Sequence, residues 1–182
     1  QGKVISRTRY SSDPFISPTL YRKVGEETNT LDSFGRITAT TYLDGTGVSR
    51  TYGCCGVTEE TDRTGVTTTY GYDDVTKQVT FMERNGITTL YSYDNCGRQT
   101  AVTVKGRSGG ELTTTVGYLY NAVSTVTDPK RFTTRYSHNY AQTNSSTLTL
   151  TETVTLPNNA TQISTYVNGL QTSTGGIGQH AQ

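Results

Sequence analysis

Apolar and polar residues alternate along several short stretches of the chain, most clearly at residues 65–73. Successive side chains of an extended strand point to opposite faces, so Val66, Thr68, Tyr70 and Tyr72 share one face. Small polar residues and Gly71 occupy the positions between them. The pattern predicts a β-strand with one apolar and aromatic face and one solvated face.

This strand pattern recurs with a period near 20 residues. Residues 65–73 return as residues 86–94, and weaker copies begin at Gly47, Glu111 and Arg131. A unit this short cannot bury its own apolar face and has to stack on its neighbours. Stacked strands would form one aliphatic row, one Thr row and two aromatic rows, with the members Ile87, Thr89, Tyr91 and Tyr93; Leu112, Thr114, Val116 and Tyr118; Phe132, Thr134, Tyr136 and His138.

Two predicted turns have an acid and a glycine at the same spacing. Asp94 precedes Gly97-Arg98, and Asp32 precedes Gly35-Arg36 in the same way. The Asp side chain can accept hydrogen bonds from main-chain N–H groups further on, and the Gly supplies a positive φ. A second short strand follows, so each unit is predicted to be a β-hairpin.

The predicted fold class is therefore all-β, with tandem hairpins of ~20 residues in one continuous antiparallel sheet that curves or spirals. Three segments are expected: a degenerate repeat region at 1–29, the hairpin repeats at 30–140, and a Thr-rich hairpin segment at 141–182 with a flexible tail. In the last segment a strictly alternating run ends at Pro157-Asn158-Asn159, and Asn168-Gly169 predicts a further hairpin.

The composition agrees with this fold and narrows the function. Thr makes up about a fifth of the 182 residues, with 13 Tyr, 19 Gly and no Trp. At 31% hydrophobic residues the core must be thin, which favours a single wall over a thick sandwich. The net charge of +1 without a basic cluster excludes a nucleic-acid footprint. We expect no membrane span, no metal site and no cofactor.

The three cysteines are too few for a disulfide scaffold. A bond between the adjacent Cys54 and Cys55 is one possibility. The favoured interpretation is that both are unpaired and serve as small residues in a turn. Cys96 lies about two repeats away, too far along a sheet for a bridge to either of them.

The unit Tyr91-x-Tyr93-Asp94-x-x-Gly97-Arg98, with its β-rich spacer, resembles the YD repeat of the RHS family. That family includes bacterial RHS and wall-associated toxins, the shell component of Tc toxin complexes, and teneurins. The resemblance covers about residues 30–140. Its repeat positions are Asp32, Gly35, Arg36, Tyr70, Tyr72, Asp73, Tyr91, Tyr93, Asp94, Gly97, Arg98, Tyr118 and Tyr136.

Three of the repeat units depart from this pattern. Cys54-Cys55 stand in place of Tyr-Asp, Leu119 replaces the Asp, and His138-Asn139 replace Tyr-Asp. The resemblance implies a hairpin strip that spirals into a shell or tube, secreted or displayed on a cell surface, and often sheltering a cargo polypeptide. About nine units give at most ~18 strands, roughly 85 Å of ribbon, too short to close a container. The chain opens at Gln1 and not at Met, which predicts either a processed product or a piece of a longer protein. We favour a piece, because the repeats run close to both ends without an evident polar cap.

Two stretches formally match catalytic motifs. Residues 106–110 fit G-x-S-x-G, and Asp128 and His138 follow in hydrolase order, but that motif needs a strand-to-helix turn and no helix is predicted. Asp128-Pro129 resembles an element near the self-cleavage site of RHS shells, yet it aligns with residues 62–65 and is expected to be an ordinary repeat loop. No catalytic residue is assigned.

Two hypotheses follow from these observations. The first is a non-catalytic wall segment of an extracellular shell, tube or fibre, whose partners are neighbouring repeats, sheet edges of other copies, or an enclosed polypeptide. The rival is an adhesin-like module that binds a surface glycan through Tyr91 and Tyr93. A buried tyrosine ladder is the favoured interpretation of these two residues.

Overall fold

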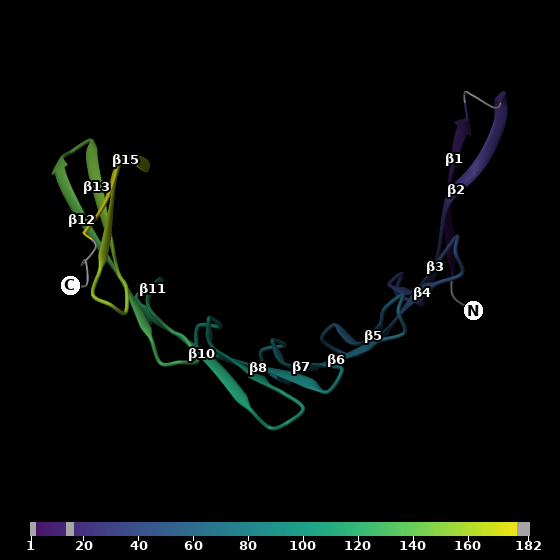
Figure 1. Ribbon diagram of the computed structural model, residues 1–182, viewed down its shortest axis with the longest axis horizontal. Helices are drawn as coiled ribbons and strands as arrows, with labels where there is room; N and C mark the ends of the chain where they lie inside the picture. Colours follow the sequence, from purple (N-terminus) through teal and green to yellow (C-terminus); the bar gives the residue numbers. More distant parts are fainter. Residues whose placement is uncertain (1–2, 14–16, 178–182) are drawn as a thin grey trace. The chain divides into compact units, whose positions relative to one another are not determined.

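The computed structural model describes residues 3–13 and 17–177, and these residues form strands and turns without a helix (Figure 1). Fifteen strands follow one another as an antiparallel meander, each pairing with the next in chain order. The strands are β1 (Val4–Asp13), β2 (Ser17–Leu31), β3 (Ile37–Tyr42), β4 (Gly47–Tyr52), β5 (Val57–Thr61), β6 (Thr67–Tyr72), β7 (Val79–Arg84), β8 (Ile87–Tyr93), β9 (Gln99–Lys105), β10 (Glu111–Leu119), β11 (Ala122–Thr127), β12 (Thr133–Asn144), β13 (Thr147–Thr155), β14 (Thr161–Val167) and β15 (Leu170–Ile177). The all-β hairpin prediction is confirmed.

By its contacts the chain divides into two compact units, which we describe separately. The first contains the residues up to Thr89 with Gly106–Ser108, and the second contains Leu90–Lys105 and the residues from Gly109 onward. The segment boundaries expected after residues 29 and 140 fall inside β2 and β12. That segmentation concerns repeat similarity and remains a prediction.

Six of the turns share one hydrogen-bonded geometry, which explains the repeated Asp and Gly positions. The first residue donates its N–H to the carbonyl four residues on, and the fourth residue donates back to the first, at 2.8–3.1 Å. The fourth residue always has a positive φ, from 65° to 80°. This is a three-residue hairpin loop with a left-handed last position, which Gly adopts without strain. The six turns span residues 32–36, 42–46, 62–66, 94–98, 128–132 and 156–160.

Two-residue turns close other hairpins. Asn85-Gly86 and Asn168-Gly169 each have two successive positive φ angles, as the turn between strongly twisted antiparallel strands requires. The hairpin predicted at Asn168-Gly169 is therefore confirmed as β14–β15. Because β15 reaches Ile177, it includes Gly175 and Gly176 of the expected flexible tail, and residues 178–182 lie outside the described part.

Few side chains are buried, as the low hydrophobic content predicts. Among the residues whose burial is described, Leu31, Ala160, Thr40 and Thr68 are buried. The Thr row supplies one of them, whereas Ile87 and other members of the aliphatic row lie largely exposed near the strand starts. In β6, Thr68 is buried between the exposed Thr67 and Thr69, so the predicted alternation of faces is confirmed there.

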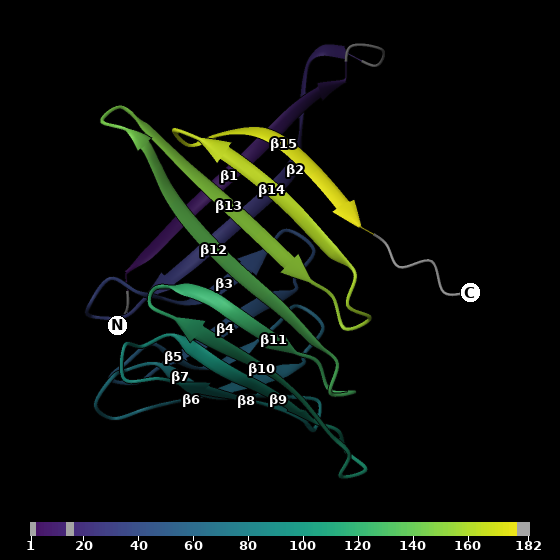
Figure 2. The ribbon, with the colours of Figure 1, turned by 90° about the vertical axis from the view of Figure 1, so that its left-hand side faces the viewer.

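The second unit carries the long C-terminal hairpins. In Figure 2, β12, β13, β14 and β15 lie side by side in chain order. The β12–β13 ladder runs from Arg135 opposite Thr155 to Asn144 opposite Thr147. In the first unit, β1 and β2 form a hairpin of similar length, with Val4 opposite Thr30. The weak pattern of residues 1–29 did not predict a hairpin of this length.

Candidate functional site

Some of the repeat motif residues assemble into a contact that we call the tyrosine clamp, which begins at the aspartate turn. Asp94 Oδ1 accepts the main-chain N–H groups of Cys96 and Arg98, each at 2.9 Å, and Asp94 Oδ2 accepts Arg98 Nε at 2.8 Å. Asp32 binds Phe34 and Arg36 in the same manner, with Arg36 Nε at 2.7 Å. The carboxylate therefore fixes both the turn and the direction of the arginine.

The arginine of each clamp covers a tyrosine of the following hairpin. The guanidinium carbon of Arg36 lies 4.5 Å from the ring centre of Tyr52, and that of Arg98 lies 4.4 Å from the ring centre of Tyr118. Such contacts combine packing with attraction between the cation and the ring face.

The tyrosine hydroxyl closes the clamp on the main chain. Tyr52 Oη donates to the carbonyl of Ile37 and Tyr118 Oη to the carbonyl of Gln99, both at 2.9 Å. Each accepting residue directly follows the clamp arginine and begins the neighbouring strand. The tyrosine is thus bound both by the side chain and by the main chain of the preceding turn.

The strand register explains why these residues meet. The β3–β4 ladder ends with Ala39 opposite Ser49, and counting on places Tyr52 opposite Arg36. The β9–β10 ladder ends with Ala101 opposite Thr115, which likewise places Tyr118 opposite Arg98. The tyrosine occupies the opening between two strands beyond the end of their hydrogen-bonded ladder.

In a variant of the clamp, the turn that contains Cys54 and Cys55, here called the cysteine turn, stands in place of the Asp–Arg pair. Tyr72 Oη donates to the Val57 carbonyl at 2.8 Å, and the same register count places Tyr72 opposite Gly56. A Cβ at Gly56 would stand 2.7 Å from Tyr72 Oη, so glycine makes room for the ring that an arginine covers elsewhere.

The turn before Gly56 carries a disulfide between Cys54 and Cys55. The favoured interpretation of these residues as unpaired turn fillers is wrong, because their adjacency in the turn brings the two sulfurs together. Cys96 is free and exposed, as its distance along the chain predicted.

The carboxylates of these turns are held in their charged form. Hydrogen bonds from Arg98 lower the pKa of Asp94, and the hydroxyl and N–H of Thr46 lower the pKa of Asp44. The Thr64 hydroxyl, followed by Arg84, depresses the pKa of Asp62 most strongly. Main-chain and hydroxyl hydrogen bonds from Thr76 lower the pKa of Asp73. The acids serve as hydrogen-bond acceptors rather than proton donors.

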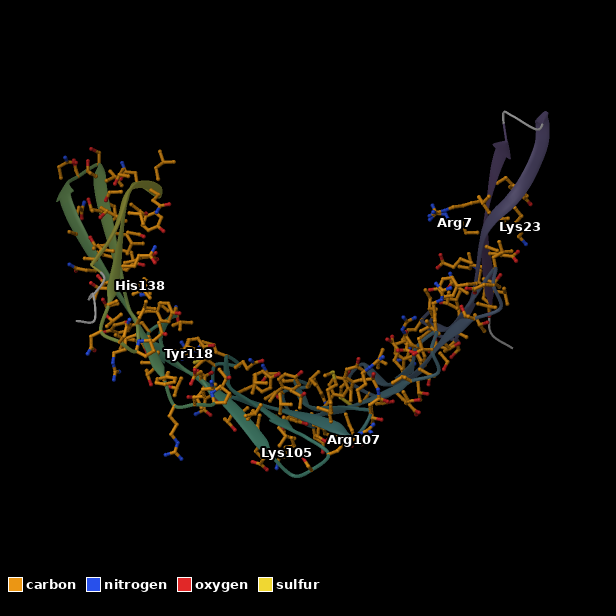
Figure 3. The ribbon with its side chains drawn as sticks, viewed as in Figure 1. Arg7, Lys23, Lys105, Arg107, Tyr118 and His138 are labelled. Atoms are coloured by element: carbon orange, nitrogen blue, oxygen red, sulfur yellow. A yellow bond between two sulfur atoms is a disulfide. The ribbon has the colours of Figure 1, made fainter. Side chains whose placement is uncertain are left out.

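A second set of arginines joins turns at the other ends of the strands in the first unit. Arg63 binds Asp44 at 2.5 Å and covers the Tyr42 ring at 4.3 Å. Arg84 binds Asp62. Arg107, visible in Figure 3, donates Nε to the Asn85 carbonyl. Each arginine reaches back 19–22 residues to an earlier turn. Neighbouring hairpins are therefore joined at both ends of their strands.

The other sequence-predicted repeat residues lie along the strands. Tyr70, Tyr91, Tyr93 and Tyr136 are half-buried, and the buried tyrosine ladder favoured from the sequence stays a prediction. Gly97 and Gly35 take the left-handed position of their turns. Asp73 caps a longer turn, in which Lys77 has the positive φ.

The stretches that match catalytic motifs lie in hairpin loops. Residues 106–110 join β9 to β10, so the helix required by a nucleophile elbow does not follow Ser108. Asp128 begins a turn with the same hydrogen bonds as the turn at Asp62, so the repeat-loop prediction is confirmed.

One feature of the second unit was missed from the sequence. A groove of about 460 Å³ lies among β10, β11 and β12, beside His138 and the exposed Tyr120 and Tyr140. The available signal is the departure of Leu119 and His138-Asn139 from the repeat pattern, which the sequence alone does not distinguish from degeneration of the repeat.

Within residues 3–13 and 17–177, no three His, Cys, Asp or Glu side chains gather as a metal site. In that same part of the chain, no helix has the length and hydropathy to cross a membrane. Neither a protein-family model nor a curated protein matches the sequence.

Proposed function

We propose that this chain is a non-catalytic wall segment of a secreted or surface-displayed shell, tube or fibre of the RHS type. The observation that carries the proposal is the tyrosine clamp. Asp94, Arg98 and Tyr118 of the repeat motif join one hairpin to the next. Residues whose shared task is to connect neighbouring units are typical of an extended architectural protein.

The sheet edges support the same function. In the described residues, the end strands β1 and β15 each pair with a single neighbour. An outer edge with unpaired main-chain N–H and C=O groups is a template for another strand. Further repeats of a longer chain, or a second copy, would continue the wall there. A wall that is continued in this way could enclose a polypeptide cargo.

Edge-directed association tests this function. The chain is expected to form larger species with rising concentration in sedimentation velocity, and strips or filaments by electron microscopy. Replacing Ser173 and Gly175 of β15 by lysine places two like charges on an exposed edge strand and should suppress association. Ser145→Lys, in the β12–β13 turn, is the matched control and should not. A chain that stays monomeric at all concentrations contradicts the proposal.

A further inference from the structure

The groove in the second unit has an aromatic rim and a mainly apolar lining that includes a few polar side chains. Leu119, Tyr120 and Tyr140 contribute largely exposed apolar surface, with 88% of Tyr120 and 63% of Tyr140 accessible. The polar side chains around the groove are those of Asn121, Ser124, Ser137 and His138. Its volume of about 460 Å³ lies in the range of small-molecule binding sites.

The groove exists because the β11–β12 hairpin lacks a clamp. The ladder between these strands ends with Thr125 opposite Arg135, and the register count that places Tyr118 opposite Arg98 places His138 opposite Ala122. Ala122 has no guanidinium, and an imidazole is shorter than a phenol. The Nε2 of His138 also lies 3.5 Å from Glu152 Oε1 on β13, on the side away from β11. The opening that a tyrosine fills in three other hairpins is therefore left open.

The preceding clamp holds an exposed ring at the rim of this opening. Tyr120 lies in the two-residue turn between β10 and β11 and has a φ of 54°, an uncommon conformation for a bulky residue. Arg98, which already binds Asp94 and covers Tyr118, also donates Nη1 to the Tyr120 carbonyl. A strained backbone that presents an exposed aromatic ring beside a groove points to a ligand contact.

The clamps that contain a tyrosine show which kind of ring fits the opening between the two strands. In each of them a flat ring lies between two strands, with its hydroxyl donating to a main-chain carbonyl of the strand start. A pyranose ring has the same features, namely a flat C–H face for an aromatic platform and a hydroxyl for the carbonyl. Its other hydroxyls could pair with Asn121, Ser124 and His138, whereas a phenol has one hydroxyl and would use few of these groups.

We propose that the groove among β10, β11 and β12 binds a saccharide ring, with Tyr120 as the stacking platform. This inference is independent of the wall function, because it concerns a ligand on one hairpin and not the association of edges. It also places a glycan site at residues other than Tyr91 and Tyr93, which are half-buried in β8.

The test is calorimetric titration of the full chain with cellobiose, lactose and N,N′-diacetylchitobiose. At least one disaccharide should bind saturably, and Tyr120→Ala should weaken that binding by about ten-fold or more. Tyr10→Ala removes a tyrosine of β1 that is 63% exposed and should leave binding unchanged.

A second variant separates ligand contact from folding. Ala122→Arg with His138→Tyr rebuilds the clamp and should fill the groove, abolishing binding while circular dichroism and thermal stability are kept. Binding that survives in this double variant would overturn the proposal. So would the absence of binding by all three sugars, saturable binding of p-cresol in their place, or binding that is lost in Tyr91→Ala but kept in Tyr120→Ala.

Discussion

The guanidinium of Arg98 lies 4.4 Å from the ring centre of Tyr118, and Tyr118 in turn donates its hydroxyl to the carbonyl of Gln99, the neighbour of Arg98. One side chain of a hairpin is therefore bound from two directions by the turn before it. The stability of β10 should depend on the turn before β9, although 20 residues separate Arg98 from Tyr118 in the sequence.

Removing the clamp hydroxyl should destabilise the protein measurably. Tyr118→Phe keeps the ring under Arg98 and deletes the hydrogen bond to Gln99. We expect a loss of about 0.5–1.5 kcal/mol in the free energy of unfolding, measured by urea titration. Tyr72→Phe should behave alike because its hydroxyl binds Val57. Tyr10→Phe, at a mostly exposed position, is the control. If Tyr118→Phe and Tyr72→Phe are as stable as Tyr10→Phe and the unaltered chain, the clamp hydroxyls contribute nothing to stability.

A methyl group at Gly71 should be costly. Gly71 stands opposite Phe81 across the β6–β7 ladder, and a Cβ there would overlap the phenyl ring. Gly71→Ala must displace this ring, and overpacking of this kind costs about 1–3 kcal/mol. A Cβ at Gly110 would meet no neighbouring atom within 4 Å, so Gly110→Ala should leave the urea midpoint unchanged. Gly71→Ala combined with Phe81→Leu should recover part of the loss, and the absence of any recovery would contradict a ring clash.

Acid should destabilise the aspartate turns. The Thr64 hydroxyl and Arg84 lower the pKa of Asp62 in the folded chain, and unfolding removes both partners. A carboxyl with a lowered folded pKa stabilises the fold above the unfolded pKa, and this contribution is lost as the pH falls through the folded value. Stability should therefore decline below about pH 4. Asp62→Asn should flatten this decline in thermal melts, whereas Asp74→Asn, at an exposed position, should retain it.

The repeated strands and turns could be predicted because their causes are local. Alternation along β6 defines its two faces, and the spacing of Asp94 and Gly97 defines the turn that the structure contains. The long β1–β2 hairpin lies almost entirely within residues 1–29, where the repeat pattern is degenerate, so periodicity carries little information about it.

The clamp could not be predicted in the same way. The contact of Arg98 with Tyr118 depends on how far the β9–β10 ladder extends before its strands separate, which the residue pattern does not state. The groove depends on the same register. His138 and Ala122 stand opposite each other at the position that a tyrosine and its partner occupy in a clamp, and this position follows from the β11–β12 pairing. From the sequence alone, these positions are indistinguishable from a degenerate repeat.

The disulfide gives the last prediction. Alkylation with iodoacetamide under denaturing conditions should modify one thiol, Cys96, and after reduction by a phosphine it should modify three. In Cys96→Ser no thiol should react before reduction. Because the bond between Cys54 and Cys55 closes the shortest possible loop, it restricts few conformations of the unfolded chain. Reduction should therefore change the unfolding free energy by at most about 1 kcal/mol. Three reactive thiols without a reductant would show that the cysteine turn is held by its main chain and by Tyr72 above Gly56, and not by the sulfur bond.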